Sequence, residues 1–186
     1  MDKQELILVT ALRLFVENGF HATPTSKIAK EAGVANGTLF HYYSTKEELI
    51  VSVYLYIKTK MGEYIDKNVK PVADAKDEFR AQYNAVMQWS TENPKEFYYT
   101  QLFNTSPFAA LLSPEEKKKQ LKKSCDQIQD AIDKGVIKNR DVDFIHTIMG
   151  SHVFGVYSYL TKNKLNKVAR QKTIDDSFEM LWGMLA

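Results

Sequence analysis

Apolar side chains recur along this sequence at the three- and four-residue spacing of amphipathic helices. Leu8, Ala11, Leu12 and Phe15 follow that spacing, so they share one face of a helix near the N-terminus. Gly19 follows this run and can end the helix with a left-handed backbone. No stretch alternates apolar and polar residues cleanly with a period of two, and we therefore expect no β-strand.

Two short helices are predicted directly after the first one. Thr23 and Pro24 fit the N-cap and the first position of a second helix, which ends at Gly33. A third helix over residues 36–43 follows after a few residues and turns Leu39 and Tyr43 toward the core. This succession predicts a helix-turn-helix arrangement.

A long helix is expected to begin next, and the sequence offers two overlapping capping boxes for its start. Either Ser44 pairs with Glu47 or Thr45 pairs with Glu48. The helix then continues to about Val69. Longer helices follow over residues 73–92, 94–104, 114–134, 141–162 and 168–185.

The fold class predicted from these elements is all-α. Residues 1–48 form a tri-helical helix-turn-helix unit, and a long helix joins it to a helical body over residues 49–186, giving about nine helices in total.

Composition agrees with a soluble globular protein of 186 residues. Apolar residues make up 44% and charged residues 26% of the chain. The single cysteine, Cys125, rules out an internal disulfide and a cysteine-rich zinc site. We find neither a signal peptide nor a membrane span, and we expect a cytoplasmic protein with no membrane partner. The net charge of +2 does not by itself indicate nucleic-acid binding.

Local charge is more informative than net charge. Between His21 and Lys46, three lysines stand against one acidic residue, Glu31. The third predicted helix lies inside this basic stretch, and Thr38, His41 and Tyr42 share its outer face. A helix with small, polar and aromatic side chains of this kind can enter the major groove of DNA.

The same stretch resembles the N-terminal signature of the tetracycline-repressor (TetR/AcrR) family of regulators. The resemblance rests on residues 28–34 (IAKEAGV), 37–43 (GTLFHYY) and 46–49 (KEEL), about the first quarter of the chain. It implies a DNA-binding surface formed by Thr25, Ser26, Lys27, Asn36, Gly37, Thr38, His41, Tyr42 and Lys46. Two positions depart from the family pattern: Phe40 lacks a common tyrosine hydroxyl, and Ala35 replaces a capping serine, so we expect Asn36 to cap the third helix.

The resemblance also implies an effector site and a dimer interface in the body. An aromatic-rich helical body can enclose a largely apolar cavity, and the residues as a set favour one, although core packing is the better explanation for any single residue. Candidate ligand contacts are Tyr83, Met87, Phe103, Phe108, Met149 and His152. Candidate dimer contacts, on the last two long helices, are Phe154, Tyr157, Ser158, Phe178, Leu181 and Trp182. The alternative is that these helices pack against each other within one chain.

Catalysis finds little support in the sequence. No phosphate-binding loop, metal-ligand motif or nucleophile motif is present, so we expect no catalytic residue, no metal site and no cofactor. Lys122 and Lys123 beside Cys125 suggest a lowered thiol pKa and a redox switch, but a surface or buried structural thiol is the favoured interpretation of Cys125. The prediction is a homodimeric repressor that binds a pseudo-palindromic operator in double-stranded DNA and is released by a small, largely apolar effector. The alternatives are a small-molecule binding module that does not bind DNA, and an all-α enzyme.

Overall fold

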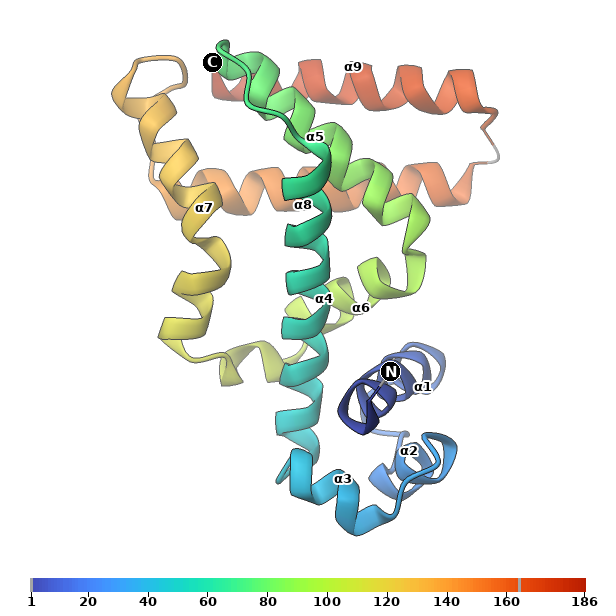
Figure 1. Cartoon of the computed structure of the whole chain (residues 1–186). Helices are drawn as coiled ribbons and strands as arrows, with labels where there is room; N and C mark the ends of the chain where they lie inside the picture. Colours follow the sequence, from blue (N-terminus) through green and yellow to red (C-terminus); the bar gives the residue numbers. More distant parts are fainter. Residues whose placement is uncertain (1, 164) are drawn as a thin grey trace. The chain divides into compact units, whose positions relative to one another are not determined.

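A computed structural model describes residues 2–163 and 165–186, and all of the regular secondary structure in this part of the chain is helical (Figure 1). The all-α prediction is therefore confirmed, with no strand among the described residues. The helices are α1 (Lys3–Asn18), α2 (Thr25–Glu31), α3 (Asn36–Tyr42), α4 (Lys46–Asn68), α5 (Ala75–Glu92), α6 (Pro94–Asn104), the 3₁₀ helix η1 (Pro107–Leu111), α7 (Pro114–Asp133), α8 (Val142–Lys162) and α9 (Lys167–Leu185).

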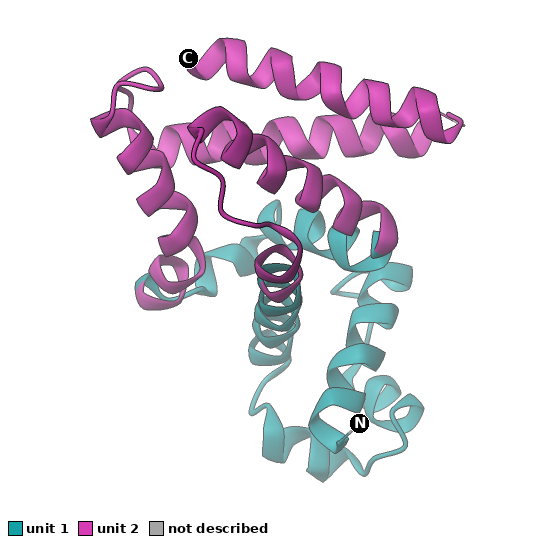
Figure 2. Ribbon diagram, turned by 45° about the horizontal axis from the view of Figure 1, so that its top comes forward, with its two compact units in different colours: residues 1–62, 93–114 teal, residues 63–92, 115–186 magenta. Residues whose placement is uncertain are grey.

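The chain divides into two compact units (Figure 2). Unit 1 comprises residues 1–62 and 93–114, and unit 2 comprises residues 63–92 and 115–186. Helix α4 begins in unit 1 and ends in unit 2, while α6 and η1 return to unit 1. A domain boundary between residues 48 and 49 stays a prediction.

The core of unit 1 combines the N-terminal helices with α6. The apolar face of α1 is buried, and Phe15 has no exposed surface. Its ring lies edge-on to Phe20 at 5.4 Å, and Phe20 in turn contacts Tyr99 of α6 and Phe108 of η1 at 5.5 Å and 5.2 Å. Edge-to-face pairs of this kind stabilise a core beyond the area they bury.

Two capping predictions have opposite outcomes. Thr45 and Glu48 form the box that begins α4: the Glu48 N–H donates to Thr45 Oγ1 at 3.0 Å, and the Glu48 carboxylate accepts from the Ser44 N–H. The prediction that Thr23 caps the second helix is wrong, since Pro24 occupies the N-cap. The Thr23 hydroxyl is fully buried and instead donates to the Gly19 carbonyl oxygen at 2.8 Å, close to the end of α1.

Unit 2 is built on the antiparallel pair α8 and α9, with α5 packed against both (Figure 1). The Tyr83 hydroxyl on α5 and the Ser177 hydroxyl on α9 share a buried hydrogen bond of 2.7 Å. His152 on α8 approaches the Ser177 carbonyl oxygen with Nε2 at 2.9 Å. These bonds satisfy polar groups in the interior and fix the order of the three helices.

Candidate nucleic-acid interface

Helix α3 is held in unit 1 by one side and exposed on the other. Leu39 is completely buried and Tyr43, directly after the helix, is 3% exposed, as the spacing predicts. Both pack toward α1 and α2, which contact α3. The burial of these two side chains fixes which face of α3 points away from the unit.

The outward face of α3 carries the predicted DNA contacts. Asn36, Gly37, His41 and Tyr42 are exposed, and Thr38 is half-buried. The His41 and Tyr42 rings lie edge-on at 5.5 Å, which leaves the imidazole and the phenol side by side on the surface. Small residues at the start of a helix and hydrogen-bonding groups along it suit close approach to base edges.

Phe40 is a further exposed member of this surface. Its side chain is 41% exposed, so it is not part of the core of the unit. The third helix also begins differently from the prediction: Ala35 is the N-cap, no side chain caps the helix, and Asn36 is its first residue. The Asn36 amide is therefore not engaged as a cap and faces solvent.

The positive charge beside α3 is not cancelled by Glu31. Arg13 of α1 forms an ion pair with the Glu31 carboxylate at 2.5 Å, and this contact lowers the pKa of Glu31. Lys27 and Lys30 on α2 are exposed. The only acidic group between residues 21 and 46 is thus already paired, and the lysines remain available for phosphate groups.

The other predicted phosphate contacts flank this surface. Thr25 is half-buried, while Ser26 is exposed in the first turn of α2. Lys46 opens α4 and is half-buried, with its Nζ 3.5 Å from the His21 carbonyl oxygen. This contact orients the Lys46 ammonium beside the chain segment that leads into α2.

The candidate ligand contacts divide between the two compact units. Tyr83, Met87, Met149 and His152 belong to unit 2, where the Tyr83 and His152 rings lie 6.0 Å apart. Burial raises the pKa of Tyr83, whose side chain is 5% exposed. The remaining two candidates, Phe103 and Phe108, belong to unit 1, where Phe103 stacks on Tyr54 at 4.2 Å.

The candidate dimer contacts on α8 and α9 lie mostly inside unit 2. Tyr157, Phe178 and Leu181 are 8%, 1% and 2% exposed, and Phe154, Ser158 and Trp182 are half-buried. The large apolar side chains that do reach the surface of the two helices are different ones. They are Phe144 and Tyr159 on α8 and Val168, Met180 and Met184 on α9.

The suggestion of an activated thiol is wrong. Burial raises the pKa of Cys125, and the carboxylates of Asp143 and Asp126 raise it further. The neighbouring lysines point elsewhere, since Lys122 and Lys123 pair with Asp126 and Asp66. Among the described residues, no group of three or more His, Cys, Asp or Glu side chains could hold a metal ion, and no helix has the length and hydropathy to cross a membrane.

Comparison with known proteins bears on this surface directly. Residues 7–53 match the sequence profile of the family described as bacterial regulatory proteins, tetR family. The fatty acid metabolism regulator protein of Bacillus subtilis is 40% identical over 74 residues, which make up 38% of this chain and 37% of that relative. The match thus spans little more than a third of the relative's length.

Solved structures resemble the chain over its full length. A Shewanella chain assigned to the TetR family of transcription regulators superposes with a TM-score of 0.92 at 27% identity, covering 100% of this chain and 99% of that one. The Bacillus subtilis regulator FadR in complex with stearoyl-CoA superposes with a TM-score of 0.72 at 25% identity, covering 98% and 99%. These relatives are transcription regulators rather than enzymes.

Proposed function

We propose that the chain is a DNA-binding transcriptional regulator of the TetR family, and that it acts as a homodimeric repressor released from its operator by a small, largely apolar effector. In each subunit α3 enters the major groove. Two-fold symmetry then requires a pseudo-palindromic operator whose half-sites are about 34 Å, or a multiple of that, apart. The protein acts in the cytoplasm, where its DNA lies.

One observation carries the DNA-binding proposal. With Leu39 buried in the unit, α3 leaves Asn36, His41 and Tyr42 exposed to solvent and Thr38 half-buried. In the proposed complex Asn36, Gly37, Thr38 and His41 meet base edges. Tyr42, Lys46 and the first turn of α2 (Thr25, Ser26 and Lys27) hold phosphates.

The proposed dimer uses the exposed apolar side of α8 and α9. Phe144, Ser151, Gly155 and Tyr159 fall on one stripe of α8 at spacings of seven, four and four residues, and all four are exposed. Exposed Met180 and Met184 stand on the neighbouring helix. Small residues between aromatic ones allow the same helix pair of a second subunit to approach closely. An exposed apolar stripe of this kind indicates an interface with another protein chain. The buried Tyr157, Phe178 and Leu181 support this surface from beneath.

The proposed effector is largely apolar, as the aromatic body suggests. The similar FadR structure is a complex with stearoyl-CoA, a ligand that carries a long apolar acyl chain. Effector binding lowers DNA affinity through α4, which begins beside α3 and extends into unit 2. The coupling is a free energy of about 1–3 kcal/mol, and it must act equally on effector affinity and DNA affinity.

Selection from a pool of random duplex DNA tests the proposal. The purified full chain is incubated with the pool and the retained duplexes are sequenced. We expect a pseudo-palindrome, and candidate effectors such as long-chain acyl-CoA are then screened for release of the operator. If a folded dimer retains no sequence even at low salt, the protein is a small-molecule binding module and the repressor proposal is wrong.

A further inference from the structure

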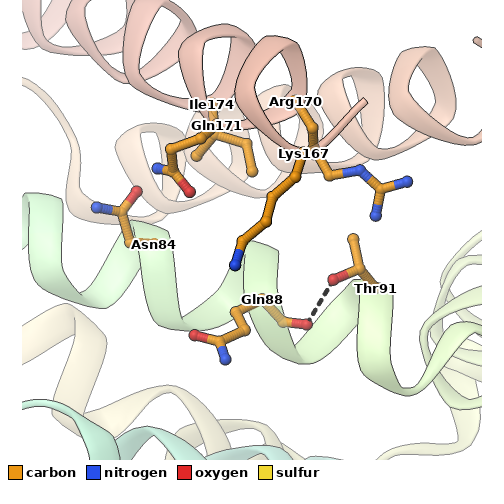
Figure 3. Close-up of a pocket in the computed structure, with 7 residues that line it drawn as sticks. All are labelled: Asn84, Gln88, Thr91, Lys167, Arg170, Gln171 and Ile174. Atoms are coloured by element: carbon orange, nitrogen blue, oxygen red, sulfur yellow. Dashed lines mark hydrogen bonds between the residues drawn. The ribbon is translucent and has the colours of Figure 1, made fainter. Parts of the chain in front are cut away.

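A pocket of about 390 Å³ lies between α5 and α9 within unit 2 (Figure 3). Its volume falls in the range of about 300–1,000 Å³ that small-molecule sites occupy. The lining residues are polar except for Ile174: α5 contributes Asn84, Gln88 and Thr91, and α9 contributes Lys167, Arg170 and Gln171. The lining therefore suits a polar ligand, unlike the apolar effector proposed above.

The polar contacts that hold α5 and α9 together lie outside this pocket. Arg80 and Lys76 on α5 both pair with Glu179 on α9, and the Tyr83 and Ser177 hydroxyls form the buried bond between them. Among the described residues, no hydrogen bond or ion pair crosses the pocket itself. The polar groups along its walls are thus left for a ligand.

The lining carries positive charge and no negative charge. Lys167 and Arg170 have no carboxylate partner in the described part of the chain, and Figure 3 shows Lys167 extended from α9 toward Gln88. Two acidic residues flank the lining, and each is held by an amide of its own helix. Gln88 Nε2 donates to Glu92 at 2.9 Å, and Gln171 Nε2 donates to Asp175 at 2.9 Å.

One buried acceptor in the pocket lacks a donor. Asn84 Oδ1 is shielded from solvent and has no hydrogen-bond partner. Buried polar atoms in folded proteins are nearly always paired, so an orphan at the wall of a pocket indicates a missing donor. The Gln88 and Gln171 amides add two more acceptors, because their nitrogens already donate to carboxylates.

We propose that this pocket binds a small phosphorylated polyol, with its phosphate between Lys167 and Arg170 and a hydroxyl donating to Asn84 Oδ1. A phosphate monoester carries a charge of about −1.5 to −2 at pH 7, which matches two cations better than a carboxylate does. The hydroxyls of the ligand supply the donors that the three amide oxygens need. This site is separate from the DNA-binding surface, and its test requires no DNA.

Calorimetric titration of the full chain tests the site. The probes are glycerol 3-phosphate, ribose 5-phosphate and glucose 6-phosphate. The controls are inorganic phosphate, which lacks the polyol, and glucose, which lacks the phosphate. We expect saturable binding of at least one ester, about tenfold or more tighter than either half. Lys167→Gln and Arg170→Gln each weaken it by about tenfold or more, as expected for the loss of a charge-assisted hydrogen bond. Lys172→Gln, an equal charge change at an exposed position of α9, leaves the affinity unchanged.

Asn84→Leu separates a binding role from a structural one. Removal of an orphaned acceptor raises the Tm of the free protein, while the same substitution weakens the ester by about tenfold. Absence of saturable binding by all three esters overturns the proposal, and so does an equal loss of affinity in Lys172→Gln. If inorganic phosphate binds as tightly as every ester, the role assigned to the ligand hydroxyl is wrong.

Discussion

The hydroxyl of Tyr99 on α6 donates a hydrogen bond of 2.8 Å to the carbonyl oxygen of Ile50 on α4. Tyr99 is fully buried, and its ring contacts Phe15 and Phe20. This one side chain joins α6 to both α1 and the first half of α4. The compact unit that carries α3 therefore includes a helix distant in sequence, and α6 can restrain the DNA-binding surface.

Tyr99→Phe should destabilise the protein modestly. The ring packing is kept, but the buried bond to Ile50 is lost, which costs about 1 kcal/mol of unfolding free energy. Urea denaturation measures this change. Tyr42→Phe, which removes a hydroxyl from an exposed side chain, is the control and should change stability by less.

The same variant should alter the response to alkaline pH. Burial raises the pKa of Tyr99 well above its usual value, so the folded state keeps the phenol proton that the unfolded chain loses near pH 10. This stability contribution is complete below pH 10 and falls as pH rises above it. In Tyr99→Phe the decline should be shallower by up to about 1.4 kcal/mol per pH unit. An unchanged slope would contradict the buried position of this hydroxyl.

Thr23→Val should also lower stability, despite the similar shape of the two side chains. The substitution leaves the Gly19 carbonyl oxygen without its buried donor, at a cost of about 1–2 kcal/mol. Thr59→Val on the exposed side of α4 is the matched control and should be nearly neutral. Equal melting temperatures for the two variants would show that the Thr23 bond contributes nothing.

His41→Ala and Lys46→Ala should affect DNA binding in different ways. Loss of a base contact at His41 changes the preferred sequence, with a penalty of about 1–3 kcal/mol on the best site. Loss of a phosphate contact at Lys46 weakens all sequences alike and reduces the salt slope by about one. Fluorescence anisotropy at several salt concentrations separates the two effects. An equal loss from both variants, with the salt slope unchanged, would refute these roles.

Charge placed on the exposed face of α8 and α9 should break the dimer. Phe144→Glu or Met180→Glu puts carboxylates into the proposed interface, where their desolvation opposes association. Sedimentation velocity should then find a monomer in place of the wild-type dimer. Val72→Glu makes the same kind of change at an exposed position outside these helices and should leave the dimer intact. A dimer that survives both interface substitutions would place the contact elsewhere.

The sequence predicts helix boundaries well where a neighbouring residue determines them. Pro94 and Asn104 bound α6 as expected, because proline at the first turn marks a helix start without any tertiary partner. Thr23 was misassigned because its hydroxyl bonds to the end of the preceding helix, a contact that a capping pattern does not reveal. Helix α8 is apolar on more than one side, so periodicity could not tell buried Tyr157 from exposed Tyr159.

Local sequence patterns do not predict sites that are formed by segments far apart in the chain. The polar pocket combines Asn84 with Lys167 and Arg170, and nothing in either segment indicates that they meet. The exposed face of α3 was predictable, since Leu39 and Tyr43 mark its buried side by spacing alone. The α6 contact of Tyr99 required the structure, because it depends on packing between helices far apart in the chain.

Methylation interference on the selected operator tests the central claim most directly. Methylation of guanine N7 blocks the major groove, where α3 is proposed to lie. We predict two clusters of interfering guanines, related by the symmetry of the operator and separated by one or more helical turns of about 34 Å. Interference confined to adenine N3 in the minor groove, or a single cluster on one half-site, would contradict the proposed complex.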